Sequence, residues 1–201
     1  DKVLIHGAAG GVGTALLDLG RLSGLQMYGT ASRNKLDMVE RLGGVPIDYQ
    51  REDFVRRVLD LSEGGVHAVF DPIGGRHWER SFRTLNPDGR LIGYGFSAAF
   101  KNGRLHIPRG LAAILGMPRF SILRLLRKSS SRGVMGYVMD SYRRPDWYRE
   151  DLARLLSLLS EKRIRPIIGK ILPLSEAPKA HELLNQAAVT GKIVLTCSPA
   201  V

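Results

Sequence analysis

The sequence contains a single cysteine, Cys197, among its 201 residues. One thiol cannot form a disulfide within the chain or build a multi-cysteine zinc site, so we expect no bound metal and a reducing compartment, the cytoplasm. The sequence also lacks a run of about 18 uncharged apolar residues, and no charged-then-apolar leader precedes its first strand-like stretch. These absences exclude a disulfide-stabilised scaffold and a membrane-spanning helix, and we expect a globular protein.

Acidic residues are also scarce relative to basic ones. The chain has 19 Asp and Glu against 30 Lys and Arg, which gives a formal net charge of +11 at pH 7. Such a charge favours an anionic partner, or it is simply a basic surface. No helix-turn-helix, zinc-finger or RNA-reading signature accompanies it, so nucleic acid is not an expected partner. The basic, apolar stretch from Pro108 to Lys128 predicts two helical pieces, split at Gly116-Met117-Pro118. Its pattern fits helices packed over a core with their arginines outside, or helices on a membrane surface.

The first part of the chain alternates short apolar strands with helical patterns. This alternation is typical of right-handed crossover units and predicts an α/β fold with a doubly wound, six-stranded parallel sheet. Strands are predicted at residues 3–6, 26–31, 46–48, 67–71, 89–94 and 133–139. Apolar residues at spacings of three and four predict helices at residues 11–23, 35–42, 53–61 and 76–84. The sequence Asn86-Pro87-Asp88-Gly89 predicts a turn before the fifth strand.

The second part ends in a different pattern. A helix is predicted from Asp146, as its N-cap, to about Lys162, as the last crossover helix. Its apolar face comprises Leu152, Leu155, Leu156 and Leu159. A strand at 167–174, a helix from Ser175 to about Ala188 and a strand at 192–196 follow. We therefore divide the chain into a parallel-sheet domain, residues 1–163, and a small C-terminal segment, residues 164–201.

A glycine-rich turn, Gly7-Ala8-Ala9-Gly10-Gly11-Val12-Gly13, joins the first strand to the first helix. A phosphate at a helix N-terminus meets unpaired backbone N–H groups and the positive end of the helix dipole, and glycine leaves its approach open. The turn departs from the usual Gly-x-Gly-x-x-Gly because Ala8 replaces the first of these glycines. We expect residues 9–13 to hold the pyrophosphate of a dinucleotide; a tight connection without a ligand is the alternative.

The end of the second strand indicates which dinucleotide is bound. An Asp or Glu there would bind the ribose 2′-hydroxyl of NAD, but the sequence reads Gly29-Thr30-Ala31-Ser32-Arg33-Asn34-Lys35. Ser32, Arg33 and Lys35 offer a hydroxyl, a guanidinium and an ammonium, which suit a 2′-phosphate. NADPH is therefore expected rather than NADH. The alternative is that Arg33 and Lys35 are ordinary solvent-facing residues at a helix start.

Several segments together resemble one family, the medium-chain dehydrogenase/reductase superfamily in its zinc-free quinone oxidoreductase branch. The resemblance rests on residues 3–13, Gly29-Thr30-Ala31-Ser32, Ile47-Asp48-Tyr49, Val69-Phe70-Asp71-Pro72-Ile73-Gly74-Gly75 and Gly89-Arg90-Leu91-Ile92-Gly93-Tyr94-Gly95. Leu174-Ser175-Glu176-Ala177, Ala180-His181 and Gly191-Lys192-Ile193-Val194-Leu195 look like the closing helix and strand of that family. The match covers nearly the whole chain and is least distinctive from about 101 to 149.

The resemblance implies a Rossmann cofactor domain over residues 1–163 and a C-terminal segment that would return to a substrate domain absent from this chain. It implies that Ser32, Lys35 and Tyr49 contact the 2′-phosphate. The residues implied to line the nicotinamide are Pro72, Ile73, Gly93 and Tyr94. It also implies a homodimer paired through the sixth strand at residues 134–138.

The activity that the resemblance implies is hydride transfer from NADPH to a quinone or an α,β-unsaturated carbonyl. No catalytic residue is assigned, since most of the substrate pocket would lie outside this chain. Two alternatives stay open. One is an enoyl-reductase module of a polyketide synthase, and the other is a non-catalytic NADPH-binding protein that docks on acidic membrane or RNA through residues 104–132.

Overall fold

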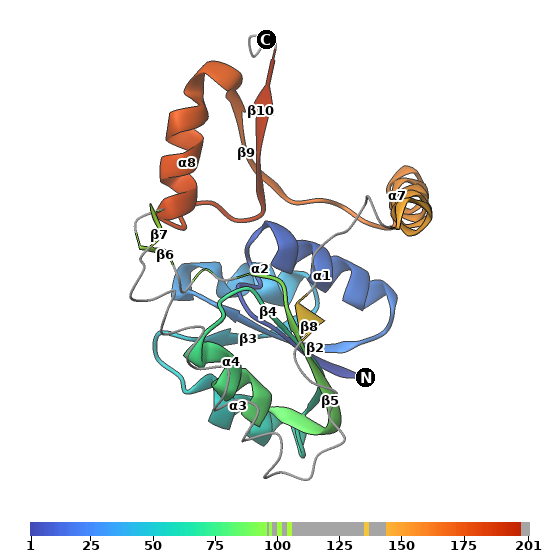
Figure 1. Cartoon of the computed structure of the whole chain (residues 1–201), viewed down its shortest axis with the longest axis vertical. Helices are drawn as coiled ribbons and strands as arrows, with labels where there is room; N and C mark the ends of the chain where they lie inside the picture. Colours follow the sequence, from blue (N-terminus) through green and yellow to red (C-terminus); the bar gives the residue numbers. More distant parts are fainter. Residues whose placement is uncertain (96, 98–99, 102–103, 106–134, 137–143, 198–201) are drawn as a thin grey trace.

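The computed structural model describes residues 1–95, 97, 100–101, 104–105, 135–136 and 144–197 (Figure 1). Its main element is a six-stranded parallel sheet in the order β3-β2-β1-β4-β5-β8, so the predicted doubly wound fold is confirmed. The strands are β1 (Lys2–Ile5), β2 (Gln26–Ala31), β3 (Gly44–Asp48), β4 (Val66–Asp71), β5 (Leu85–Gly93) and β8 (Met135–Gly136). The strand order reverses between β1 and β4, which is where open parallel sheets bind ligands.

Helices cover both faces of this sheet (Figure 1). They are α1 (Gly11–Leu22), the 3-10 turn η1 (Arg33–Lys35), α2 (Leu36–Arg41), α3 (Phe54–Ser62) and α4 (Arg76–Arg83). Alternate residues of β1 enter two separate cores: Val3 and Ile5 join the cluster that includes Leu17 of α1, whereas Leu4 joins the cluster of α3 and α4. A strand that is buried on both faces has a continuous apolar sequence, as in Val3-Leu4-Ile5.

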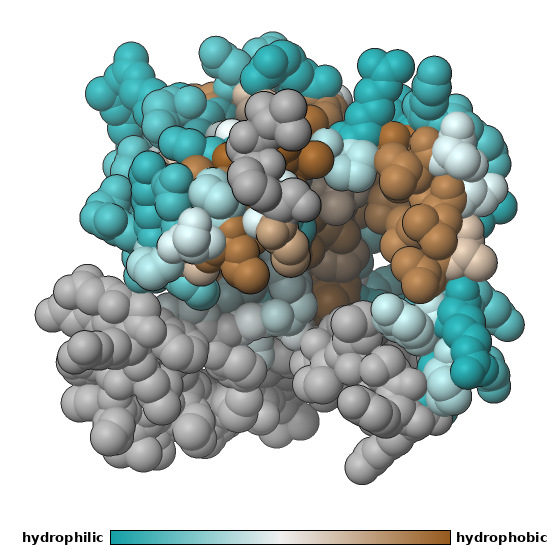
Figure 2. Space-filling model, turned by 90° about the horizontal axis from the view of Figure 1, so that it is seen from above, coloured by the Kyte–Doolittle hydropathy of each residue, from teal (hydrophilic) through white to brown (hydrophobic). Residues whose placement is uncertain are grey.

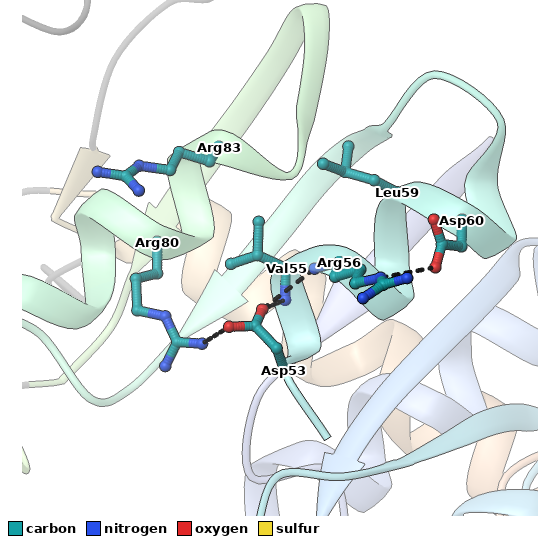
Figure 3. Close-up of a pocket in the computed structure, with 7 residues that line it drawn as sticks. All are labelled: Asp53, Val55, Arg56, Leu59, Asp60, Arg80 and Arg83. Atoms are coloured by element: carbon teal, nitrogen blue, oxygen red, sulfur yellow. Dashed lines mark hydrogen bonds and ion pairs between the residues drawn. The ribbon is translucent and has the colours of Figure 1, made fainter.

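The start of α3 is fixed by a capping carboxylate. Asp53 Oδ1 accepts hydrogen bonds from the backbone N–H groups of Val55 and Arg56 at 2.9 and 3.1 Å, and Arg80 donates to Asp53 Oδ2 at 3.0 Å (Figure 3). The hydrogen bond from Arg56 N–H is the main reason that the pKa of Asp53 lies below its usual value. Such a cap stabilises a helix by about 1 kcal/mol, and here it also ties α3 to α4.

The predicted turn at residues 86–89 lies inside β5 rather than before it. Leu85 already pairs with Val66, and the ladder resumes where Arg90 pairs with Ala68. The stretch of β5 between these two pairs is longer than the matching stretch of β4, so β5 bulges outward and exposes Pro87 and Asp88. The sequence correctly indicated an irregular backbone at residues 86–89, but β5 pairs with β4 both before and after this irregular stretch.

Two predictions for the last long helix, α7 (Pro145–Ser160), are wrong: its N-cap residue and its place as a crossover helix of the main sheet, since the next strand belongs to a different sheet. Pro145 occupies the first turn and Arg144 the N-cap position, so Asp146 lies within the helix and does not cap it. The apolar face of Leu152, Leu155, Leu156 and Leu159 is 40–55% exposed, and Leu158 is the buried leucine. Figure 1 shows α7 standing apart from the sheet, so this face does not cover the sheet.

The C-terminal segment forms the predicted strand-helix-strand extension. It consists of β9 (Ile168–Pro173), the 3-10 turn η3 (Leu174–Glu176), α8 (Ala177–Asn185) and β10 (Lys192–Thr196), and β9 and β10 pair in parallel. Leu172 and Ala180 are buried in it. Several large apolar side chains stay exposed: Ile168, Ile171, Leu174, Leu184 and Val194. Figure 2, which looks down on this side of the molecule, shows apolar residues at the surface.

The remaining described strands, β6 (Phe100–Lys101) and β7 (Arg104–Leu105), form a short antiparallel pair. Only Met135–Gly136 of the predicted sixth strand is described, and it pairs with Ile92 and Gly93 of β5. The basic stretch at 108–128 lies outside the described residues. Within the described part of the chain, no helix combines the length and apolarity needed to cross a membrane.

Candidate functional site

The glycine turn after β1 is shaped by close backbone contacts. Gly7 has a φ of 62°, a left-handed conformation that favours glycine, and its carbonyl oxygen accepts a hydrogen bond from Gly10 N–H at 2.9 Å. A Cβ on Gly13 would overlap that carbonyl oxygen and the backbone of Ala8. The third glycine of the motif therefore lets α1 begin directly against the turn, which a larger residue would prevent.

The first turn of α1 is suited to an anion. Gly10 is the N-cap and offers no side chain to the free N–H groups, and the first turn contains no acidic residue. The positive end of the helix dipole is therefore uncompensated by the protein itself. A phosphate group at this position would accept hydrogen bonds from these N–H groups.

A cleft of about 240 Å³ lies beside the turn, at the carboxyl ends of β1, β2 and β3. It joins residues of the glycine turn, the end of β2, the residue after β3 and the C-terminal segment. The lining residues are Gly7, Ala9, Gly10, Gly11, Ala31, Ser32, Lys35, Tyr49, Leu184, Ala187, Val189 and Gly191. None of these residues carries a carboxylate, which agrees with the acid-free end of β2 noted in the sequence.

The cleft collects six of the thirteen predicted cofactor residues, and three others predicted at the glycine turn and after β2 lie outside it. Ala9, Gly10, Gly11, Ser32, Lys35 and Tyr49 line it. Val12 is 45% exposed outside this lining, and Gly13 is buried where α1 meets the turn. Arg33 is exposed and does not line the cleft either.

Lys35 already has partners that the sequence did not indicate. Its Nζ donates hydrogen bonds to the carbonyl oxygens of Ala187 and Val189 at 2.6 and 2.8 Å. An ammonium has three donors, so one remains for a further acceptor. Burial lowers the pKa of Lys35. The neighbouring Ser32 hydroxyl donates to the Asn34 side-chain oxygen at 2.8 Å.

The C-terminal segment is attached to the turn through its backbone. Gly191 N–H donates to Ala9 O at 2.9 Å, and the next residue, Lys192, donates from its N–H to Ile167 O at 2.8 Å. Near α1, Arg165 N–H donates to the Asp18 carboxylate at 2.6 Å. Sequence reasoning missed this side of the cleft, because the contacts of Gly191 with Ala9 and of Arg165 with Asp18 join residues about 150 positions or more apart and leave no local pattern.

The other predicted residues lie across the switch point, at the ends of β4 and β5. Tyr94 N–H donates to Asp71 O at 3.2 Å, which joins the loop after β5 to the end of β4. Ile73 N–H donates to the Asp71 carboxylate at 2.7 Å. A Cβ on Gly93 would overlap Trp78, so this predicted site residue also has a packing role. Burial, reinforced by the charge of Asp71, raises the pKa of Tyr94 to about 12, and its phenol is neutral at pH 7.

A buried polar network supports the loop after β4. Asp71 Oδ2 accepts hydrogen bonds from the Ser81 hydroxyl at 2.7 Å and from His77 Nδ1 at 2.7 Å. His6 lies between Ser81 Oγ and Thr30 Oγ1, at 3.0 Å from each. Burial by itself raises the pKa of Asp71, but the hydrogen bond from His77 and the nearby histidines outweigh it, so this pKa lies below its usual value.

Three members of this network, His6, Asp71 and His77, also have ligand atoms within 4.8 Å of one another, as a metal site requires. Both oxygens of Asp71 already accept hydrogen bonds, and both ring nitrogens of His6 have partners. These atoms of Asp71 and His6 therefore have partners within the protein, and the Asp71 carboxylate supports the loop at residues 72–74 through the N–H groups of Ile73 and Gly74.

A second, wider cavity of about 500 Å³ lies between α3 and α4 (Figure 3). Both of its carboxylates are paired with arginines: Asp53 with Arg80 at 3.0 Å and Asp60 with Arg56 at 3.9 Å. It lacks the free helix N-terminus and the glycine turn of the first cleft. We therefore place the candidate site at the glycine turn.

The sheet, its switch point and the glycine turn together define a Rossmann-type dinucleotide-binding domain. The family model described as "Zinc-binding dehydrogenase" matches residues 43–195, and the chain belongs to this family. The expected resemblance to the medium-chain dehydrogenases and reductases is thereby confirmed.

Individual relatives agree with this assignment. The chain is 30% identical to the human synaptic vesicle membrane protein VAT-1 homolog, over 98% of this chain and 51% of the relative. It is also 30% identical to a phenolphthiocerol/phthiocerol polyketide synthase of Mycobacterium tuberculosis, over 98% of this chain and 8% of that protein. The Escherichia coli quinone oxidoreductase complexed with NADPH is 26% identical and superposes with a TM-score of 0.77, over 97% of this chain and 56% of that one. The chain thus spans about half the length of the VAT-1 homolog and the quinone oxidoreductase.

We predict that acid destabilises the fold through His6. Burial, aided by the charge of His77, lowers the pKa of His6 to about 3, whereas an unfolded histidine titrates near 6.5. Between these values the unfolded chain binds a proton that the folded chain does not, so stability falls as the pH falls, by at most about 1.4 kcal/mol per pH unit. Urea unfolding from pH 6.5 to 4.5 measures this slope.

His6→Gln should flatten the dependence of the unfolding free energy on pH, although the variant is less stable at pH 7. His67→Gln, which removes a half-exposed imidazole on β4 outside the buried network, is the matched control for the substitution itself. An unchanged slope in His6→Gln would contradict the role of His6.

Proposed function

We propose that this chain is the NADPH-binding part of an oxidoreductase that transfers hydride to a quinone or an α,β-unsaturated carbonyl. The observation that carries the proposal is the acid-free cleft beside the glycine turn, with the Lys35 ammonium at its edge. The quinone oxidoreductase complexed with NADPH, which shares this fold, supports the choice of cofactor.

The residues present fit such a cofactor. The free N–H groups at the start of α1 would donate hydrogen bonds to the diphosphate, and Ser32, Lys35 and Tyr49 would surround the 2′-phosphate of the adenosine. The loops of Pro72–Ile73 and Gly93–Tyr94, joined through Asp71, would hold the nicotinamide ring and keep water from one of its faces. NADPH bound there would supply the hydride, and the protein would supply its orientation.

We further propose that residues 1–163 are the cofactor domain and that residues 164–201 pack on a substrate domain supplied by sequence outside this chain. The exposed apolar side chains of β9, α8 and β10 support this, because apolar surface of this kind is normally covered. The length of the relatives supports it as well.

A second candidate is an enoyl-reductase module of a polyketide synthase. It is supported by the identity to the mycobacterial polyketide synthase, of which the match occupies 8%. Both candidates use the same cofactor site and the same hydride transfer, and they differ in whether the acceptor is a free small molecule or an acyl chain on a carrier. Sequence on either side of this chain that encodes carrier or ketoreductase domains would favour the module.

We also propose a homodimer that forms through the sheet edge at β8, since β8 is the last strand in the sheet order. An edge strand offers unpaired backbone groups to a second copy. Sedimentation equilibrium should give twice the chain mass, and Met135→Pro, which removes a backbone donor from β8, should shift the equilibrium toward monomer. A monomeric wild-type protein would contradict the proposal.

The cytoplasm is the compartment that we propose, since Cys197 is a free thiol.

The preference for NADPH should depend on Lys35 and much less on Arg33. In Lys35→Met the Kd for NADPH should rise about ten-fold or more while the Kd for NADH changes little, because a charge-assisted hydrogen bond to the 2′-phosphate is lost. Arg33→Met should leave the ratio of the two constants near its wild-type value, since Arg33 does not line the cleft. Fluorescence titration with both nucleotides measures the constants, and an unchanged ratio in Lys35→Met would refute the assignment.

The activity is tested with the chain extended by its natural upstream sequence. Such a protein should oxidise NADPH in the presence of a quinone or an enone, while residues 1–201 alone should bind NADPH without turnover. Hydrogen exchange should show added protection of β9 and α8 in the longer protein. No turnover with any member of a quinone and enone panel would count against the proposed reaction.

A further inference from the structure

The side chain of Lys192 crosses the N-terminus of α1. Lys192 is the first residue of β10, and its side chain runs over Gly11, the first residue of the helix. A Cβ on Gly11 would lie 2.5 Å from Lys192 Cδ, 2.8 Å from Cε and 3.1 Å from Nζ. Glycine at position 11 therefore leaves the space that the lysine stem occupies, and the ammonium lies beside the helix end.

This arrangement brings two positive centres together. The start of α1 carries the positive end of the helix dipole, and its first turn has no acidic residue to offset it. Lys192 forms no ion pair with any residue that the structure describes. Asp18, farther along α1, already binds Arg21 and Arg165 N–H. A bound anion would offset the repulsion between the ammonium and the helix end, and both positive centres would stabilise the anion.

The position of the lysine is set by backbone contacts that do not depend on its charge. Lys192 N–H donates to Ile167 O, and the preceding Gly191 N–H donates to Ala9 O inside the glycine turn. Gly10 and Gly191 also form a β-bridge. The C-terminal segment thus brings its cation to the same turn. Lys192 does not line the cleft itself; it lines an adjoining pocket, together with Asp18, that shares Gly11 with the cleft.

We propose that the Lys192 ammonium binds the diphosphate of the dinucleotide, so that the C-terminal segment contributes a cationic ligand to the cofactor site. This inference rests on the proposed NADPH site. Lys192 and Lys35 then have separate roles. Lys35 distinguishes NADPH from NADH by the 2′-phosphate, whereas Lys192 contacts the diphosphate that both nucleotides share. Loss of the Lys192 ammonium therefore weakens the binding of both nucleotides by a similar factor.

The test compares Lys192→Met with Lys170→Met, which removes the same charge from an exposed position on the adjacent strand β9. We expect the Kd values of NADPH and NADH each to rise about ten-fold in Lys192→Met, with their ratio unchanged, and to stay near wild type in Lys170→Met. Lys192→Arg should restore most of the affinity. The loss should shrink as salt is raised, because salt screens the exposed ammonium.

Titrations are run beside thermal unfolding without nucleotide, so that a folding defect is recognised; if Lys192→Met does not fold, Lys192→Gln takes its place. Wild-type Kd values in the folded variant would overturn the inference while leaving the NADPH site intact. A loss confined to NADPH would also overturn it, since it would place Lys192 at the 2′-phosphate. If the wild-type protein binds neither nucleotide, the proposed function fails, and this inference fails with it.

Discussion

The close contact between the start of α1 and the glycine turn is the constraint on which the rest of the site depends. With glycine at position 13, the helix begins directly on the Gly7 carbonyl, and with glycine at position 7 the chain turns with a left-handed residue. The positive end of the helix dipole then lies at the carboxyl ends of the strands, next to the switch point. A bulkier residue at position 13 would push α1 outward and move the free N–H groups away from the cleft.

Charge around this turn is arranged for an anion from several sides. The helix end has no acidic cap, the cleft lining has no carboxylate, and the Lys35 ammonium comes from η1. This local excess, rather than the formal charge of the whole chain, is what would select a phosphorylated ligand. Elsewhere basic residues pair with acids, as Arg80 does with Asp53 and Arg57 with Glu52.

The two ends of the candidate site are built by different means. At the glycine turn the backbone itself forms the site, so small residues are required. Beyond the switch point, side chains determine the geometry: the Asp71 carboxylate gathers Ile73 N–H, Ser81 and His77, while neutral His6 connects Ser81 to Thr30. A largely buried hydrogen-bonded network of this kind holds one loop conformation, because loss of Asp71 or Ser81 would leave buried polar atoms without a partner.

The sequence by itself determined the parallel sheet, the glycine turn and the acid-free end of β2, because these depend on local patterns: apolar runs, small residues at a helix start and the residue types that follow a strand. Local patterns also predicted the boundaries of β2 and β10 correctly. They did not determine which face of α7 is buried, that the turn at Pro87 is a bulge within β5, or that Arg33 lies outside the cleft. Only the tertiary structure decided that the C-terminal segment reaches the turn, where it places Ala187 and Val189 on Lys35 and Lys192 over Gly11. Such contacts join residues far apart in the chain, and their energies arise only when the backbone brings the two surfaces together.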